Sequence, residues 1–107
     1  MTHRVAKFFA MRIIMTLYFK FLGGYEQMET RVAVMSIIVE NTSSIETLNN
    51  ILHEYRENII GRMGIPYHQK HINIISIALD APQDVISALS GRIGNLDGVS
   101  VKTAFSK

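Results

Sequence analysis

The chain has 107 residues, 48% of them hydrophobic, and this length fits one domain with a substantial core. It contains no cysteine, which excludes disulfides and thiolate metal sites and favours a reducing cytoplasm as its location. The net charge is +2, but residues 28–107 carry seven Lys and Arg against eight Asp and Glu, a balance of −1. The basic excess therefore lies in residues 1–27, and the remainder lacks the electrostatic footprint of a nucleic-acid-binding domain.

The first 27 residues are rich in Phe, Met and Ile, with basic side chains scattered among them. Arg12 and Lys20 leave too short an apolar run for a membrane-spanning helix, and no clear cleavage site indicates a signal peptide. A Gly-Gly pair upstream of Met28 can be encoded by a ribosome-binding sequence at a suitable spacing. Two interpretations stay open: in-frame upstream sequence before a natural start at Met28, or a genuine tail. Under either, residues 1–27 are an extension and 28–107 form the domain.

The first half of this domain predicts a strand, a helix and a second strand. Residues 31–40 are apolar and β-branched, which is typical of a buried strand. Ser43 and Glu46 then fit a capping box at a helix start. The helix has apolar residues at spacings of three and four, at Ile45, Leu48, Leu52, Tyr55 and Ile59. Residues 58–67 predict a strand weakened by glycines, in which Pro66 suits a sheet edge.

The second half repeats the order. Residues 72–80 predict another apolar strand, Pro82 suits the first turn of a helix, and residues 99–105 alternate as a last strand. The second helix has its apolar face at Val85, Ile86, Leu89, Ile93 and Leu96. The order β-α-β-β-α-β predicts an α+β, ferredoxin-like fold: a four-stranded antiparallel sheet with both helices on one face and the first and third strands at its centre.

Both central strands are apolar on both faces, although helices can cover one face alone. The first strand places Ala33, Met35, Ile37 and Val39 on one side and Val32, Val34, Ser36 and Ile38 on the other. A soluble monomer rarely exposes such a patch, so we expect a homo-oligomer that packs through the sheet. The small Ser36 and Ser76, at matching places in the two halves, indicate the side that a second layer approaches.

The chain contains three long and specific strings, RVAVMSIIVEN, LHEYRENIIGRMGIPY and INIISIALDAPQDVISALSGRIGNLDGVSVKTAFSK. They closely resemble the iron-only hydrogenase system regulators, small bacterial ACT-like proteins related in fold to the sensing domain of nickel-responsive repressors. The resemblance spans about residues 30–107 and implies a transcription-related, ligand-sensing role linked to a hydrogenase system. The segment before it is too short and apolar for a repressor's DNA-binding domain, so direct nucleic-acid binding is not expected. The alternative is a structural or partner-binding assembly protein without a small ligand.

Four residues are candidates for binding a small effector. Asn41, Thr42 and Ser43 follow a central strand at a helix N-terminus, where free N–H groups can hold an anion, or else they simply cap the helix. The resemblance to ACT-like domains favours binding near this loop, between subunits. Arg62 is either a ligand clamp or a side chain whose stem covers apolar surface.

Three histidines are weaker candidates, as ligands of a metal ion. His68 and His71, with His53 as a third ligand, have the imidazole chemistry that nickel, zinc and copper accept, but no cysteine is present and a polar hairpin turn with two solvated histidines explains the pair better. Arg56 and Arg92 are interpreted as solvated helix positions. The sequence has no nucleophile motif, phosphate-binding loop or convincing carboxylate pair, so we expect neither catalysis nor a cofactor.

Overall fold

The computed structural model describes residues 29–107, and the predicted extension 1–27 lies outside the described residues. The chain contains four strands, β1 (Arg31–Val39), β2 (Ile59–Tyr67), β3 (Ile72–Ala81) and β4 (Val99–Phe105). Its two α-helices are α2 (Ile45–Glu54) and α3 (Gln83–Gly94). Three short 3-10 turns connect them, η2 (Thr42–Ser44), η3 (Arg56–Asn58) and η4 (His68–Lys70).

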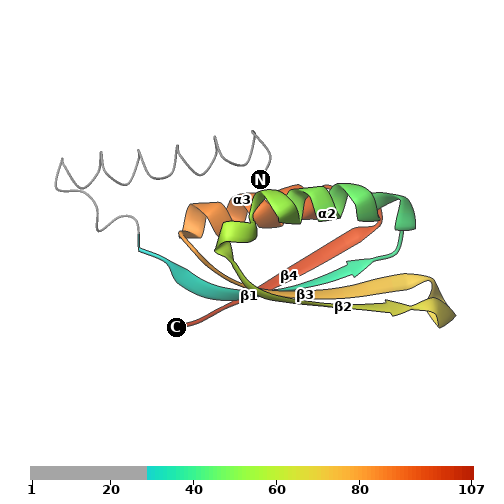
Figure 1. The fold of residues 1–107 in the computed structure, drawn as a ribbon, viewed down its shortest axis with the longest axis horizontal. Helices are drawn as coiled ribbons and strands as arrows, with labels where there is room; N and C mark the ends of the chain where they lie inside the picture. The colour runs from blue at the N-terminus through green and yellow to red at the C-terminus, as the bar shows by residue number, and fades with distance from the viewer. Residues whose placement is uncertain (1–28) are drawn as a thin grey trace.

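All three strand pairings are antiparallel, and the strand order is β2-β3-β1-β4. The apolar strands β1 and β3 are therefore central, and β2, which contains Pro66, is an edge strand. Figure 1 shows α2 and α3 together on one side of the sheet. The predicted ferredoxin-like α+β fold is thus confirmed. Within residues 29–107, neither helix is long and apolar enough to cross a membrane.

The register of the central strands decides which apolar face is the core. Met35 lies opposite Ile77, and both side chains are fully buried under the helices. Ser36 lies opposite Ser76, one residue further on, so both serines point away from the helices. The core is completed from the helix layer by Leu48, Leu52, Ile86, Leu89 and Ile93. The serine side of the sheet is therefore the side without helices.

Two local predictions for the first helix are wrong. Helix α2 ends at Glu54, and Ile59 is the first residue of β2, where it faces Leu79 of β3. An apolar residue at this point satisfies helical spacing and also reaches the same core from the sheet. The capping box does not form either, because the Ser43 hydroxyl donates to Asn41 Oδ1, 2.7 Å away, and not to the backbone near Glu46.

The two helices are joined by an ion pair at their exposed surface. Arg92 Nη1 lies 2.7 Å from Glu54 Oε2, and its guanidinium also lies 5.7 Å from the centre of the Tyr55 ring. The hydrogen bond to Glu54 raises the pKa of Arg92 above its ordinary value. Arg92 is therefore more than the solvated position that its spacing predicts, since it connects α3 to α2.

Candidate functional site

The loop between β1 and α2 carries three of the four predicted ligand-binding residues, and its polar groups are used internally. Asn41 Oδ1 accepts hydrogen bonds from the Ser43 N–H and the Ser43 hydroxyl, at 3.0 and 2.7 Å. The Asn41 amide also donates to the carboxylate of Asp97 in the turn before β4. The Ser44 hydroxyl donates to the Asp97 carbonyl at 2.7 Å. These bonds fix the loop against the α3–β4 turn, so capping and loop anchoring account for Asn41 and Ser43.

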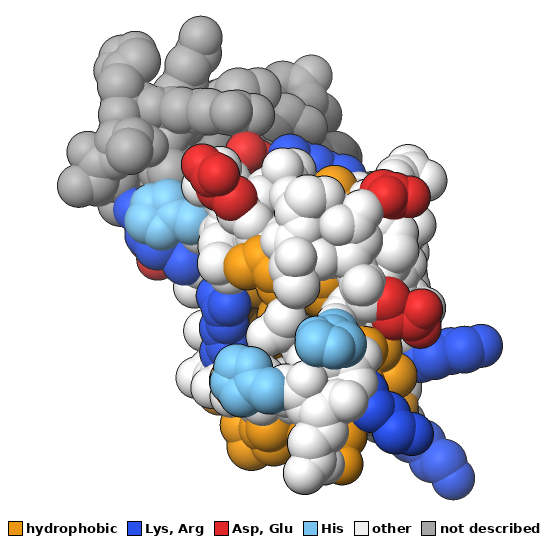
Figure 2. Space-filling model, turned by 90° about the vertical axis from the view of Figure 1, so that its right-hand side faces the viewer, with side chains coloured by type: hydrophobic (Ala, Val, Ile, Leu, Met, Phe, Trp, Pro, Cys, Tyr) orange, Lys and Arg blue, Asp and Glu red, His pale blue; other side chains and the backbone are white. Residues whose placement is uncertain are grey.

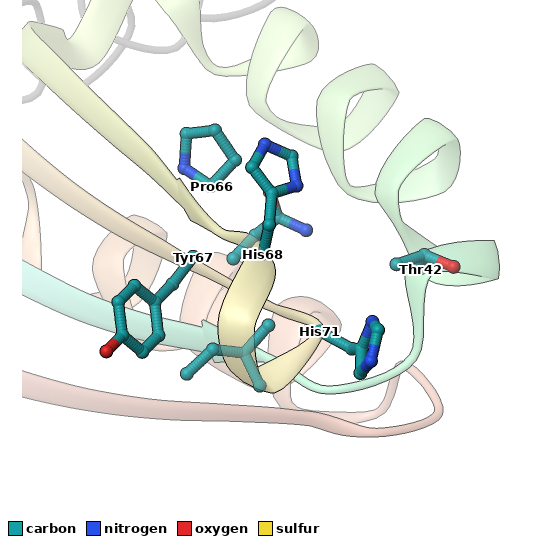
Figure 3. Close-up of a pocket in the computed structure, with 7 residues that line it drawn as sticks. Thr42, Pro66, Tyr67, His68 and His71 are labelled. Atoms are coloured by element: carbon teal, nitrogen blue, oxygen red, sulfur yellow. The ribbon is translucent and has the colours of Figure 1, made fainter.

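Thr42, the remaining loop candidate, lines a pocket of about 320 Å³ together with the β2–β3 hairpin. The other lining residues are Pro66, Tyr67, His68, His71, Ile72 and Asn73. His68 begins the 3-10 turn, and His71 ends it in a left-handed conformation with φ of 55°. Figure 3 shows the imidazole of His71 beneath Thr42, while that of His68 points away from it, toward Pro66. The two rings do not converge on one point.

The third predicted metal ligand lies elsewhere. His53, near the end of α2, lines a separate groove and not the hairpin pocket. Within the described part of the chain, no three His, Asp or Glu side chains lie together as metal ligands would. The weak metal prediction for His68 and His71 thus gains no third ligand from the fold.

Arg62 lies in that separate groove, between α2 and β2, and away from the Asn41–Ser43 loop. The groove has a volume of about 280 Å³ and is lined by Asn49, Leu52, His53, Arg56, Ile59 and Arg62. Arg62 Nη2 donates to Asn49 Oδ1 at 2.6 Å. Arg56 Nη1 lies 2.9 Å from His53 Nε2, and because a guanidinium has no acceptor, this imidazole nitrogen must accept. The α2–β2 groove therefore gathers two guanidinium groups and one imidazole.

The sequence analysis did not predict this cluster of Arg56, Arg62 and His53. Asn49, His53 and Arg56 are spaced by four and three residues, which places them on one flank of α2 and the 3-10 turn that follows. That spacing was a usable signal. What the sequence did not show is that the bulge near Gly61 in β2 brings Arg62 beside the same flank.

The side of the sheet opposite the helices, here called the bare face, exposes many large apolar side chains. Its large apolar side chains are 39–59% exposed: Val32, Val34, Ile38, Met63, Ile65, Tyr67 and Ile74. Figure 2 shows hydrophobic side chains gathered along the lower margin of the molecule, on this side of the sheet. Two charged residues, Asp80 and Lys102, share the bare face by register with Val32 and Ser36.

Comparison with known proteins supports the fold and confirms the family that the sequence resembles. The family model TM1266-like, described as an iron-only hydrogenase system regulator, matches residues 31–103. The solved structure of the uncharacterized protein TM1266 from Thermotoga maritima is 35% identical, and the match covers 74% of this chain and 100% of that one, with a TM-score of 0.71. A formyltetrahydrofolate deformylase from Pseudomonas putida is 13% identical, and the match covers 68% of this chain and 28% of that one, with a TM-score of 0.51. At this identity the match indicates a similar fold and nothing more. A comparison with curated proteins finds no match. The chain belongs to the iron-only hydrogenase system regulator family.

Proposed function

We propose that this chain is a ligand-sensing, ACT-like regulatory domain of an iron-only hydrogenase system, and that it works as a homo-oligomer paired through the bare face. The regulatory part is supported by the family and by the 35% identity to its solved member. The oligomeric part is supported by one observation, the seven large apolar side chains that the bare face leaves half exposed.

The apolar area is large enough to favour association. Full burial of a Val, Leu, Ile or Met side chain stabilises by about 1.5–3 kcal/mol, so a side chain that is already half buried contributes about half of that. Seven such side chains on each of two copies give a total on the order of 10–20 kcal/mol before costs. Loss of translational and rotational freedom costs about 4–15 kcal/mol. A stable pair is therefore within reach without any other contact.

A second copy of the chain suits this face better than an unrelated partner. Two-fold pairing brings the same surface of each subunit together, so the surface must be complementary to itself. The bare face has small side chains at its centre, Ser36 and Ser76, which allow a close approach of two sheets. It also carries one acidic and one basic side chain, Asp80 and Lys102, and a surface with both signs can pair with itself.

Regulation is proposed to act through protein partners in the cytoplasm, without direct contact to DNA and without catalysis. Residues 28–107 have a charge balance of −1, which does not favour the phosphate backbone of nucleic acid. The rival function is a partner-binding assembly protein that senses no small ligand. Both functions use the bare face, so the test that distinguishes them is whether the chain binds a small ligand.

The oligomer is tested by placing lysines at the centre of the bare face. Ser36→Lys together with Ser76→Lys would bury unpaired charges in a paired molecule, but should be tolerated in an isolated subunit because both side chains point away from the core. We expect light scattering to show wild-type dimers or larger assemblies and folded monomers of the variant. The matched control, Asn50→Lys with Asn95→Lys, adds the same charge at an exposed position of α2 and at the exposed residue after α3, and should leave the assembly unchanged. A wild-type chain that is monomeric at micromolar concentration would refute the oligomer.

The sensing part needs a separate measurement. A ligand that binds the native state alone raises the melting temperature. A thermal-shift screen with amino acids, nucleotides, organic acids and divalent metals should find a selective rise. If the assembly persists and no compound raises the melting temperature, the rival function is the correct one.

A further inference from the structure

The α2–β2 groove holds guanidinium groups whose charges are poorly compensated. Among the residues that the structure describes, no carboxylate forms an ion pair with Arg62, whose contact is the neutral Asn49 at 2.6 Å. Arg56 approaches Glu57, but its Nε lies 3.8 Å from the carboxylate oxygen, a long and exposed contact. Arg92, by comparison, has Glu54 at 2.7 Å. Glu57 is therefore a distant partner of Arg56, and no carboxylate is among the residues that line the groove.

The donors of Arg62 are also mostly unused, whereas Arg56 Nη1 donates to His53 Nε2 and to the His53 carbonyl. A guanidinium has five N–H donors, and Arg62 commits one of them to Asn49. Asn49 holds the Arg62 fork in place from α2, and His53 accepts from Arg56, so neutral acceptors position both cations without neutralising them. Figure 2 shows histidine and basic side chains next to each other on the left flank, the side of α2 and β2. Such an arrangement is suited to an anion that arrives from solution.

Apolar residues in the groove restrict the kind of anion. Leu52, 2% exposed, and the partly buried Ile59 line the same groove as the cations. The volume of about 280 Å³ is near the lower end of the range for small-molecule sites. Because Leu52 is already buried, the exposed part of Ile59 is the apolar surface that an inorganic ion would leave in water and a short alkyl chain would cover.

We propose that the α2–β2 groove binds a small organic acid, with its carboxylate on Arg62 and Arg56 and its alkyl part on Ile59. This inference rests on the sensing role proposed above and gives it a place and a ligand class. The site is separate from the bare face. Arg62 pairs with Ile77, which is buried under the helices, so Arg62 lies on the helix side of β2, and its neighbour Met63 lies on the bare side.

The test is an NMR titration of the full chain with butyrate as the probe, at constant ionic strength, with chloride and inorganic phosphate as comparison anions. We expect amide shifts confined to the second half of α2, the turn after it and the start of β2. Arg62→Gln should weaken butyrate binding about tenfold, because it removes a charged hydrogen-bonding fork. Arg62→Lys should weaken it as well, because the charge remains but the fork is lost. Lys70→Gln removes the same charge from the exposed β2–β3 hairpin, outside the groove and the bare face, and should leave binding unchanged.

Four results would overturn the proposal. Equal weakening by Arg62→Gln and Lys70→Gln would show a general charge effect. Phosphate binding as tightly as butyrate would remove the role of the apolar lining. Shifts centred on the Asn41–Ser43 loop would move the site to the other end of α2. Light scattering on the same samples distinguishes the two proposals. An intact assembly that binds no butyrate refutes the proposed acid site but not the oligomer. A monomer that binds butyrate refutes the oligomer but not the acid site.

Discussion

Gly98 in the turn before β4 should be the least replaceable residue of the loop system around the candidate site. Its φ is +68°, and an added Cβ would lie 2.6 Å from Asn41 Cβ and 2.9 Å from the Asn41 backbone nitrogen. The Gly98 carbonyl also accepts the Glu40 N–H at 2.7 Å, which ties the end of β1 to this turn. Gly98→Ala therefore meets a strained conformation and a close backbone neighbour at once.

The two effects can be given rough sizes. A non-glycine residue in the left-handed region costs about 1–2 kcal/mol. Overpacking costs about 1–3 kcal/mol, and here the neighbour is backbone, which cannot rotate away. The sum, about 2–5 kcal/mol, is a large fraction of the roughly 5–15 kcal/mol that stabilises a typical domain. We expect Gly98→Ala to lower the free energy of unfolding by this amount.

Denaturant unfolding followed by circular dichroism measures the change, and Gly91→Ala is the matched control. Gly91 is exposed in α3, and an added Cβ would meet nothing within 4 Å. The same substitution there should stabilise by up to about 1 kcal/mol, since alanine favours a helix. If the free energy of unfolding of Gly98→Ala lies within about 0.5 kcal/mol of the wild-type value, the close approach of Gly98 and Asn41 is not part of the native fold.

Three further outcomes are expected. Asn41→Ala should lower the free energy of unfolding, measured with denaturant, by about 1–2 kcal/mol, because the hydrogen bonds to Ser43 and Asp97 are both lost. An unchanged free energy of unfolding would contradict the anchoring role of these bonds. His68→Ala with His71→Ala should change the free energy of unfolding by less than about 0.5 kcal/mol, and calorimetry should detect no tight nickel or zinc site for the pair to abolish. A chain that begins at Met28 should keep its melting temperature, as expected from a family match that begins at residue 31, and a large drop would place residues 1–27 within the domain.

The sheet could be predicted almost in full because its signals are local. β1 and β3 are continuous apolar runs, and the observed bounds differ from the prediction by one residue at one end of each. Pro66 marked β2 as an edge, and the glycines of that strand accompany a bulge between Ile59 and Gly61. The end of α2 was misplaced because Ile59 satisfies helical spacing and strand packing equally. Periodicity alone cannot separate two structures that bury the same side chain.

The candidate site was harder to predict, because it depends on which polar groups the fold leaves unused. Asn41 and Ser43 have the composition of a ligand loop, but the α3–β4 turn, more than 50 residues later, takes up the amide of Asn41. Arg62 was a candidate without partners in the sequence, and the fold supplies Asn49, His53 and Arg56 from the flank of α2. Pairings of this kind arise from register and crossover geometry. Residue types and spacing cannot give them.

Strand β2 carries both proposed surfaces, and its alternation keeps them separable. Arg62 is opposite Ile77, on the side of the helices, and Met63 is opposite Ser76, on the bare face. Substitutions at Arg62 therefore alter the groove without entering the sheet interface, and substitutions at Ser76 do the reverse. As an edge strand, β2 bonds to β3 on one side and has no strand on the other among the described residues. An acid bound to Arg62 and a second subunit packed on Met63 would therefore contact opposite sides of the same outer strand.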